Sequence, residues 1–177
     1  MNNKINNNEA SSSGLAKTFT WIAWILGLAV AMFVFQEVLD YQWNPNQTPQ
    51  SKLNLSGKAQ VKLKQNNSGH YITTGTINSN PVVFFLDTGA TQVSIPAHIA
   101  QTLNLDTYGQ YPVQTANGTV TVYRTKIESL SIGNLHLYNI SAHINPGMQS
   151  DEILLGMSAL KKVEFSQSGK ELTLVER

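Results

Sequence analysis

The sequence predicts an all-β domain, a small closed or partly closed barrel with one or two short helices, preceded by one transmembrane helix. Two observations lead to this fold class. An almost unbroken apolar run, Phe19–Phe35, stands near the start of the chain. From about Gly57 onward, short runs rich in Val, Ile, Thr and Tyr alternate with Gly, Asn and Pro, as strands alternate with turns. The length of 177 residues allows one domain of ordinary size plus appendages.

Composition excludes several classes of function. The formal net charge is +1 and charged residues make up 13% of the chain, which speaks against a nucleic-acid-binding surface. The chain has no cysteine, so disulfides, zinc–thiolate sites and cysteine nucleophiles are excluded. Its 4 histidines are scattered without the spacing of metal ligands. We therefore expect no metal and no cofactor.

The N-terminal region predicts a membrane anchor. Residues 1–17 are rich in Asn and Ser and are expected to form a disordered cytoplasmic N-terminus. The apolar run that follows is about 26 Å long as a helix, close to the roughly 30 Å of a bilayer core, so 18–39 is predicted to cross the membrane. Lys17 precedes the run, and Glu37 and Asp40 follow it. The positive-inside rule then predicts a single-pass protein of the inner (cytoplasmic) membrane, with its folded domain periplasmic or extracytoplasmic.

A cleaved signal peptide is the alternative for this run, because Ala29-Val30-Ala31 fits the small-x-small cleavage pattern. Cleavage there would leave an apolar stub on the mature protein, which favours the uncleaved anchor. Residues 40–57 are polar, contain Pro45 and Pro49, and show no periodicity. They are predicted to form a flexible linker that holds the folded domain, 58–177, off the membrane.

Within the folded domain, alternating apolar and polar residues predict a first strand at 59–64. Pro96 opens a short helix over 97–103, and a further helical turn is expected at 157–161. Asn117-Gly118 between two β-type runs is a strong hairpin signal. Similar β-type runs predict the other strands, at 70–77, 82–86, 92–95, 111–115, 120–126, 130–132, 135–137, 140–144, 153–156, 163–165 and 171–175.

One motif carries chemistry. Asp87-Thr88-Gly89 directly follows an apolar strand and occurs once in the chain. It places a carboxylate at the end of a buried strand, where glycine lets the chain turn sharply. Two such carboxylates face to face can share a proton and activate water for hydrolysis. The alternative reading of Asp87 is an aspartate that merely caps a turn.

The stretch Phe85–Ala90, the Asn-Gly hairpin downstream, and Leu154-Leu155-Gly156 before a short helix resemble the retropepsin-like (clan AA) aspartic proteases. The order of these motifs is similar to the bacterial membrane-anchored branch with a single Asp-Thr-Gly motif. The resemblance covers roughly 69–177. It implies a membrane-anchored aspartic-type endopeptidase that hydrolyses peptide bonds with water activated between two Asp87 carboxylates.

The resemblance also implies roles for individual residues. The hairpin 111–123 would be a flap that closes over substrate, although an ordinary surface hairpin is the alternative. The implied site residues are Asp87, Thr88 and Gly89 for catalysis, Ala90, Thr115, Ala116, Asn117 and Gly118 for substrate binding, and Leu154, Leu155 and Gly156 for structural support.

A single motif implies that the second carboxylate comes from a second copy of the chain, so a homodimer is expected. The final strand, Glu171–Val175, is a candidate for pairing between the two copies. The expected partners are a polypeptide substrate, a second copy and the membrane, with no nucleic acid. Self-processing in the linker is a further expectation. The alternative function is a non-catalytic, membrane-tethered peptide-binding or dimerisation module on the same barrel.

Overall fold

The computed structural model describes residues 9–115 and 118–177, with side chains described from residue 16 onward in those ranges. The chain divides into two units, Met1–Asp40 and Tyr41–Arg177. The described part of the first unit is helical and belongs to α1 (Glu9–Trp43). The second unit holds the strands.

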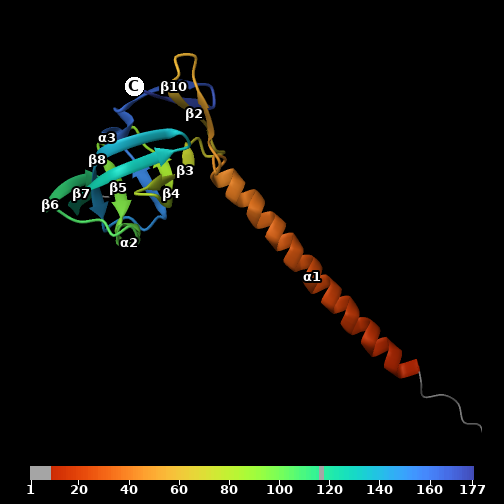
Figure 1. Ribbon diagram of the computed structural model, residues 1–177. Helices are drawn as coiled ribbons and strands as arrows, with labels where there is room; N and C mark the ends of the chain where they lie inside the picture. Colours follow the sequence, from red (N-terminus) through yellow and green to blue (C-terminus); the bar gives the residue numbers. More distant parts are fainter. Residues whose placement is uncertain (1–8, 116–117) are drawn as a thin grey trace, which may run out of the picture. The chain divides into compact units, whose positions relative to one another are not determined.

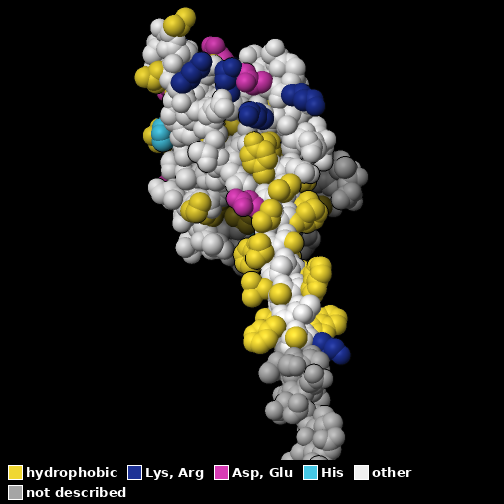
Figure 2. Space-filling view, turned by 90° about the vertical axis from the view of Figure 1, so that its right-hand side faces the viewer, with side chains coloured by type: hydrophobic (Ala, Val, Ile, Leu, Met, Phe, Trp, Pro, Cys, Tyr) yellow, Lys and Arg dark blue, Asp and Glu magenta, His cyan; other side chains and the backbone are white. Residues whose placement is uncertain are grey.

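Helix α1 is long and apolar. Its segment Ala16–Trp43 has a mean hydropathy of 2.1 with none of it buried in protein, and it is the one described helix long and apolar enough to cross a membrane. Large apolar side chains lie around the described part of the helix (Figure 2). The helix forms because the run contains no proline and is rich in residues that tolerate helical backbone. The predicted membrane segment 18–39 lies inside it. Residues 9–17, expected from their composition to be disordered, are part of the same helix, and 1–8 lie outside the described residues.

The second unit consists mainly of strands, with two short helices (Figure 1). Both helices were expected from the sequence, at Pro96 and after Gly156. The elements in chain order are β1 (Gln50–Leu53), β2 (Ala59–Lys64), β3 (Ile72–Ile77), β4 (Asn80–Leu86), β5 (Val93–Pro96), α2 (Ala97–Thr102), β6 (Gln110–Thr115), β7 (Gly118–Ile132), β8 (Leu135–Asn145), β9 (Glu152–Leu155), α3 (Met157–Leu160), β10 (Val163–Ser168) and β11 (Glu171–Glu176).

Seven strands form a sheet in the order β3-β4-β9-β5-β8-β7-β6, and pairing of β3 with β7 closes six of them into a ring. At this closure Thr76 pairs with Ser131, and their hydroxyl oxygens lie 2.6 Å apart. Gly75 permits the close approach, because a Cβ there would overlap the Ser131 carbonyl and the Phe84 ring. Strand β6 stays outside the ring and pairs with β7 (Figure 1). The predicted partly closed, all-β barrel is confirmed.

The hydrophobic core fills the ring and continues beneath the second sheet. Fully buried side chains include Phe84, Ile95 and Ile153 from the ring, and Leu63 from β2. Along β2 the apolar residues are buried and alternate with more exposed polar ones, as the sequence predicts. The core thereby holds β4 and β9 in fixed positions, and the motif residues lie on these strands or directly after them.

The second sheet has the order β1-β2-β11-β10. Strand β11 lies between β2 and β10, so both of its edges are paired within the chain. The expectation that Glu171–Val175 pairs with a second copy is therefore wrong. Strand β10 pairs with the backbone groups on one edge of β11, and β2 pairs with those on the other edge.

The segment 40–57 differs from the flexible linker that its composition predicts. Helix α1 continues to Trp43, and Gln50–Leu53 forms β1, paired with β2. Between them Asn46 is buried: its Nδ2 donates to the carbonyl oxygens of Lys64 (2.9 Å) and Ile72 (2.7 Å). The Asn46 side chain thus makes the hydrogen bonds to β2 and β3 that a backbone without regular secondary structure cannot make. Composition alone does not reveal such an arrangement, since the same residues suit an open tether.

Candidate active site

The motif Asp87-Thr88-Gly89 forms a tight loop directly after β4. The Asp87 N–H donates to the carbonyl of Leu155 on the parallel strand β9 (3.2 Å), which fixes the start of the loop. The Gly89 N–H donates to Asp87 Oδ1 (2.8 Å). Asp87 is partly exposed, and Thr88 and Gly89 are exposed. The loop therefore presents its carboxylate to solvent while one backbone donor orients it.

Strand β9 and the residues after it support the loop from behind. The N–H groups of Met157 and Ser158 donate to the carbonyls of Ala90 (2.8 Å) and Thr91 (3.0 Å). A Cβ on Gly156 would overlap the carbonyl oxygens of Ala90 and Gln92, so glycine is required there. The structure thus brings Leu154, Leu155 and Gly156 together with the Asp87 loop.

Asp87 opens onto a cleft of about 740 Å³. Its walls come from the loop after Asp87, from β6 and the start of β7, from the end of β8, and from the segment that joins β8 to β9. The lining includes apolar side chains such as Val113, Val120 and Leu154, together with polar ones. Among the described residues that line it, Asp87 is the one acid. A cleft with these dimensions can hold part of an extended peptide.

The predicted flap is the β6–β7 hairpin. Val113 pairs with Val120 and Thr115 with Gly118, and the Thr115 hydroxyl donates to the Gly118 carbonyl (2.8 Å). Ala90 and Thr115 both line the cleft, so the structure brings these two predicted substrate-binding residues to one site. Gly118 lies at the start of β7, with the positive φ of +110° that favours glycine. Ala116 and Asn117, predicted to form the flap tip, lie outside the described residues.

Sequence reasoning missed a polar cluster on the cleft wall. The Tyr111 hydroxyl donates to Gln92 Oε1 (3.3 Å) and lies 3.2 Å from His143 Nδ1. The Arg124 guanidinium carbon lies 4.8 Å from the centre of the Tyr111 ring. No motif links these four residues, because they come from separate elements that only the folded sheet brings together. Strand alternation could have placed His143 on a face, but not its partners.

His143 is buried, and this burial lowers the pKa of its imidazole from the ordinary value of about 6.5. The cause is desolvation, which penalises the charged ring. The imidazole on the cleft wall is therefore neutral at neutral pH.

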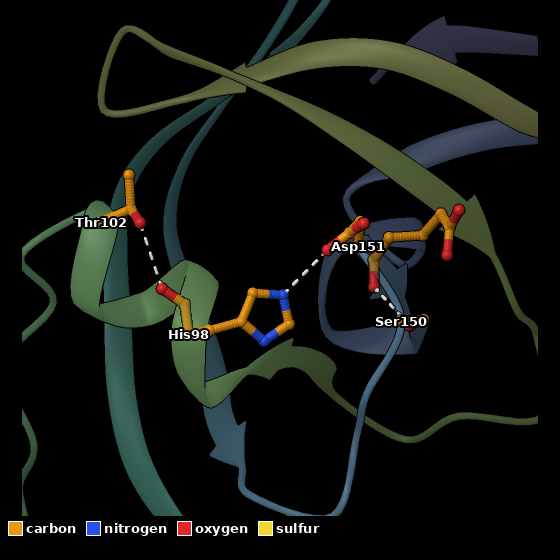
Figure 3. Close-up of polar contacts among 5 residues, drawn as sticks. His98, Thr102, Ser150 and Asp151 are labelled. Carbon is orange, nitrogen blue, oxygen red and sulfur yellow. Dashed lines mark hydrogen bonds and ion pairs between the residues drawn. The ribbon is translucent and has the colours of Figure 1, made fainter.

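The segment between β8 and β9 contributes Gly147 and Met148 to the cleft. At its start the Gly147 N–H donates to Asn145 Oδ1 (2.9 Å). Near its end His98 Nε2 lies 3.0 Å from Asp151 Oδ1, which connects it to α2 (Figure 3). Both side chains of this contact are exposed, so it contributes little to stability.

Comparison with known proteins places the chain in a family. A family model described as "gag-polyprotein putative aspartyl protease" matches residues 73–162, a range that includes Asp87 and Gly156. A Sinorhizobium protein with the name "Uncharacterized protein in cobV 5'region" is 31% identical over 114 residues, or 63% of this chain and 49% of that protein. A Rickettsia prowazekii protein named "Uncharacterized protein RP867" is 27% identical over 119 residues, which are 66% of this chain and 51% of that protein. The chain thus spans about half the length of these relatives.

Among solved structures, the crystal structure of a retropepsin-like aspartic protease from Rickettsia conorii has the same fold. The TM-score is 0.55 and the sequence identity 23%, over 73% of this chain and 95% of that one. The Asp87 loop and its supporting strand both lie within the range that the family model matches. The chain therefore belongs to the retropepsin-like aspartyl protease family.

Proposed function

We propose that this protein is an aspartic-type endopeptidase that is active as a homodimer. The observation that supports this most is a lone, partly exposed carboxylate in a peptide-sized cleft: Asp87 is the one acid among the described lining residues. Acid proteases need two carboxylates that share a proton. One chain supplies one, so a second copy related by two-fold symmetry would supply the other.

In the proposed dimer the two Asp87 carboxylates face each other and share one proton. The ionised carboxylate removes a proton from the attacking water, and the protonated one donates a hydrogen bond to the scissile carbonyl. The Gly89 N–H already orients the Asp87 carboxylate. Thr88 is exposed beside it, where its hydroxyl can reach the other copy.

In this proposal the predicted flap and loop residues bind the substrate. Ala90 and Thr115 face the cleft, and Gly118 continues the hairpin. A flap that closes over a bound peptide excludes water and strengthens the electrostatic interactions beneath it. For Ala116 and Asn117 the proposal rests on the sequence.

We place the protein in the cytoplasmic membrane with α1 as its anchor. The support is the length and apolarity of Ala16–Trp43 and the charges that flank the run, Lys17 before it and Glu37 and Asp40 after it. These charges favour an N-terminus in the cytoplasm and a catalytic domain outside it. Confinement to one bilayer raises the effective concentration of the two copies and so favours the dimer.

Self-processing between the anchor and the barrel is part of the proposal. Gln47 and Thr48 are exposed and precede β1, so they are one accessible place for a cut. Asn44 and Asn46 beside them are buried, and a peptide bond there would need local opening first. Shortened forms should appear with the wild-type chain and be absent with Asp87→Asn.

The direct test uses the full chain in detergent micelles with a casein digest as substrate. Asp87→Asn should lower cleavage by about a thousandfold or more while it leaves folding and dimerisation intact. The matched control is Asp106→Asn, an exposed aspartate that does not line this cleft. Equal cleavage by Asp87→Asn and wild type would disprove the proposal. If the wild type binds peptides without cleaving them, the non-catalytic peptide-binding module is correct instead.

A further inference from the structure

We propose that Tyr111, Gln92 and His143 form an anchor that holds the base of the flap against the loop that carries Asp87. The three side chains, here named the flap anchor, are positioning residues: they act on substrate binding through the flap. This inference rests on the proposed function and deepens it, because it says how the open side of the cleft is controlled.

The anchor joins elements that are otherwise separate at this point. Tyr111 lies on β6, which among the described strands pairs with β7 alone. Its hydroxyl reaches across the cleft wall to Gln92 (3.3 Å), in the loop that runs from Asp87 to β5, and to His143 (3.2 Å) on β8. The flap is thus linked to the same short loop that presents the carboxylate. A shift of the flap base would move Gln92 or break its hydrogen bond.

The hydrogen-bond pattern is complete with a neutral imidazole. A tyrosine hydroxyl has one hydrogen, and donating it to Gln92 Oε1 leaves the oxygen free to accept from His143 Nδ1–H. Burial keeps His143 uncharged by lowering its pKa. Arg124 lies directly opposite His143 in the β7–β8 register, so the two residues approach the Tyr111 ring from neighbouring strands.

Arg124 also holds the tyrosine ring. Its guanidinium carbon lies 4.8 Å from the ring centre, within the range of a cation–π contact. The T-shaped contact of the His143 ring with the Tyr111 ring, at 6.2 Å between centroids, restrains it from another side. The ring is therefore fixed by two contacts that do not involve the hydroxyl, and removal of the hydroxyl alone tests the anchor.

The residues after Tyr111 belong to the hairpin but not to the anchor. Pro112 pairs in register with Thr121 at a position whose backbone groups point away from β7, because the Arg124 N–H donates to the Gly109 carbonyl and strand alternation then turns the backbone groups of Tyr111 and Val113 toward β7. Beyond Pro112 the hairpin is held by the pairing of Val113 with Val120 and of Thr115 with Gly118. We expect Tyr111 to stay fixed while the hairpin beyond Pro112 opens and closes.

The test compares Tyr111→Phe with Tyr138→Phe in the full chain in detergent micelles. Tyr138 is an exposed tyrosine on β8 outside the cleft and serves as the matched control. Two quantities are measured: hydrogen exchange of the backbone amides in β6 and in residues 118–122, and the separate kcat and KM for a peptide of the casein digest.

For Tyr111→Phe we expect flap amides to exchange about three- to tenfold faster and KM to rise by a similar factor, with kcat changed less than twofold. Tyr138→Phe should change neither quantity. The double variant Tyr111→Phe with Gln92→Leu should raise KM by less than the product of the two single effects, because both variants remove the Tyr111–Gln92 hydrogen bond.

Unchanged flap exchange in Tyr111→Phe would overturn the anchor, as would faster exchange spread evenly over the whole barrel. Exchange needs no catalysis, so it decides the anchor even when the wild-type chain cleaves nothing. That latter result would contradict the proposed protease function alone.

Discussion

Two segments of the second unit differ in how far their polar groups are hydrogen-bonded within the chain. The junction segment, Trp43–Asn46, is satisfied within the chain: Asn66 Nδ2 donates to the Trp43 carbonyl (3.0 Å), and Asn46 is bonded on both its amide nitrogen and its oxygen. Both asparagines are buried. The Asp87 loop is open, since one backbone donor orients its carboxylate and the neighbouring Thr88 is exposed.

The difference shows how structural polar groups are distinguished from functional ones in this fold. A buried polar group must find its partners in the folded chain, because leaving it unpaired is costly. A half-exposed carboxylate is hydrated by solvent, so it can bind a group from a substrate or from a second copy of the chain. The junction segment is therefore expected to control stability, and the Asp87 loop to control activity.

The largest effect on stability is expected at Gly156, where the exposed Asp87 loop packs tightly against the residue after β9. Gly156→Ala places a Cβ against two backbone carbonyls, those of Ala90 and Gln92, and neither can move without displacing the Asp87 loop. We expect a loss of about 3–4 kcal/mol in the free energy of unfolding, measured by urea denaturation, together with loss of cleavage. Gly57→Ala, where no atom lies within 4 Å of the added Cβ, is the control for glycine replacement, although its φ of +75° carries a smaller cost of its own. Equal losses for the two variants would contradict the packing argument.

The next effect concerns the junction segment. Asn46→Ala removes the donor to Lys64 and Ile72 and the acceptor of the Lys64 N–H (2.6 Å), and leaves these backbone groups unpaired. The free energy of unfolding should fall by about 2–4 kcal/mol, because several buried hydrogen bonds are lost at once. Asn80→Ala, on an exposed asparagine, should cost less than about 0.5 kcal/mol. A loss of unfolding free energy as small as that of Asn80→Ala would mean that the junction segment is a flexible linker, as its composition predicts.

A smaller effect, of opposite sign, is expected at Tyr71. Its hydroxyl is buried and has no hydrogen-bond partner among the described residues, and burial raises the pKa of this phenol. Tyr71→Phe removes the unpaired group, so the free energy of unfolding should rise by about 1 kcal/mol. Destabilisation by this variant in thermal or urea unfolding would show that the hydroxyl is satisfied.

The smallest expected effect is a pH dependence of the free energy of unfolding, caused by His143 on the cleft wall. Because burial lowers the pKa of His143 in the folded state, the unfolded chain binds a proton first as the pH falls below about 6.5. This group therefore lowers stability progressively below pH 6.5 and has no effect above it. In His143→Gln the decline in unfolding free energy between pH 7.5 and 5 should be shallower than in wild type. An identical decline would exclude His143 as its source.

Much of the site could be predicted from local sequence. Asp87-Thr88-Gly89 after an apolar strand, and Leu154-Leu155-Gly156 before a helical turn, are contiguous motifs whose chemistry follows from neighbouring residues. The apolar run of α1 and the alternation in β2 are equally local. These predictions depend on periodicity and turn chemistry, which a sequence displays directly.

The parts that were missed or misjudged depend on contacts between distant residues. Tyr111 and His143 meet only because β6, β7 and β8 are adjacent in the sheet. Asn46 reaches Lys64 and Ile72 across the fold, so a segment that resembles a tether is pinned. The strand at Glu171–Val175 was misjudged because a strand's sequence does not reveal whether its edges are already paired.

The central claim is that the active site is shared between two copies, and mixing chains tests it directly. Wild-type and Asp87→Asn chains are co-reconstituted in equal amounts in lipid vesicles at constant total protein, and peptide cleavage is measured. If only dimers with two intact Asp87 residues are active, the equal mixture should retain about a quarter of the wild-type rate. Retention of about half would mean that each chain acts independently and would contradict the shared site.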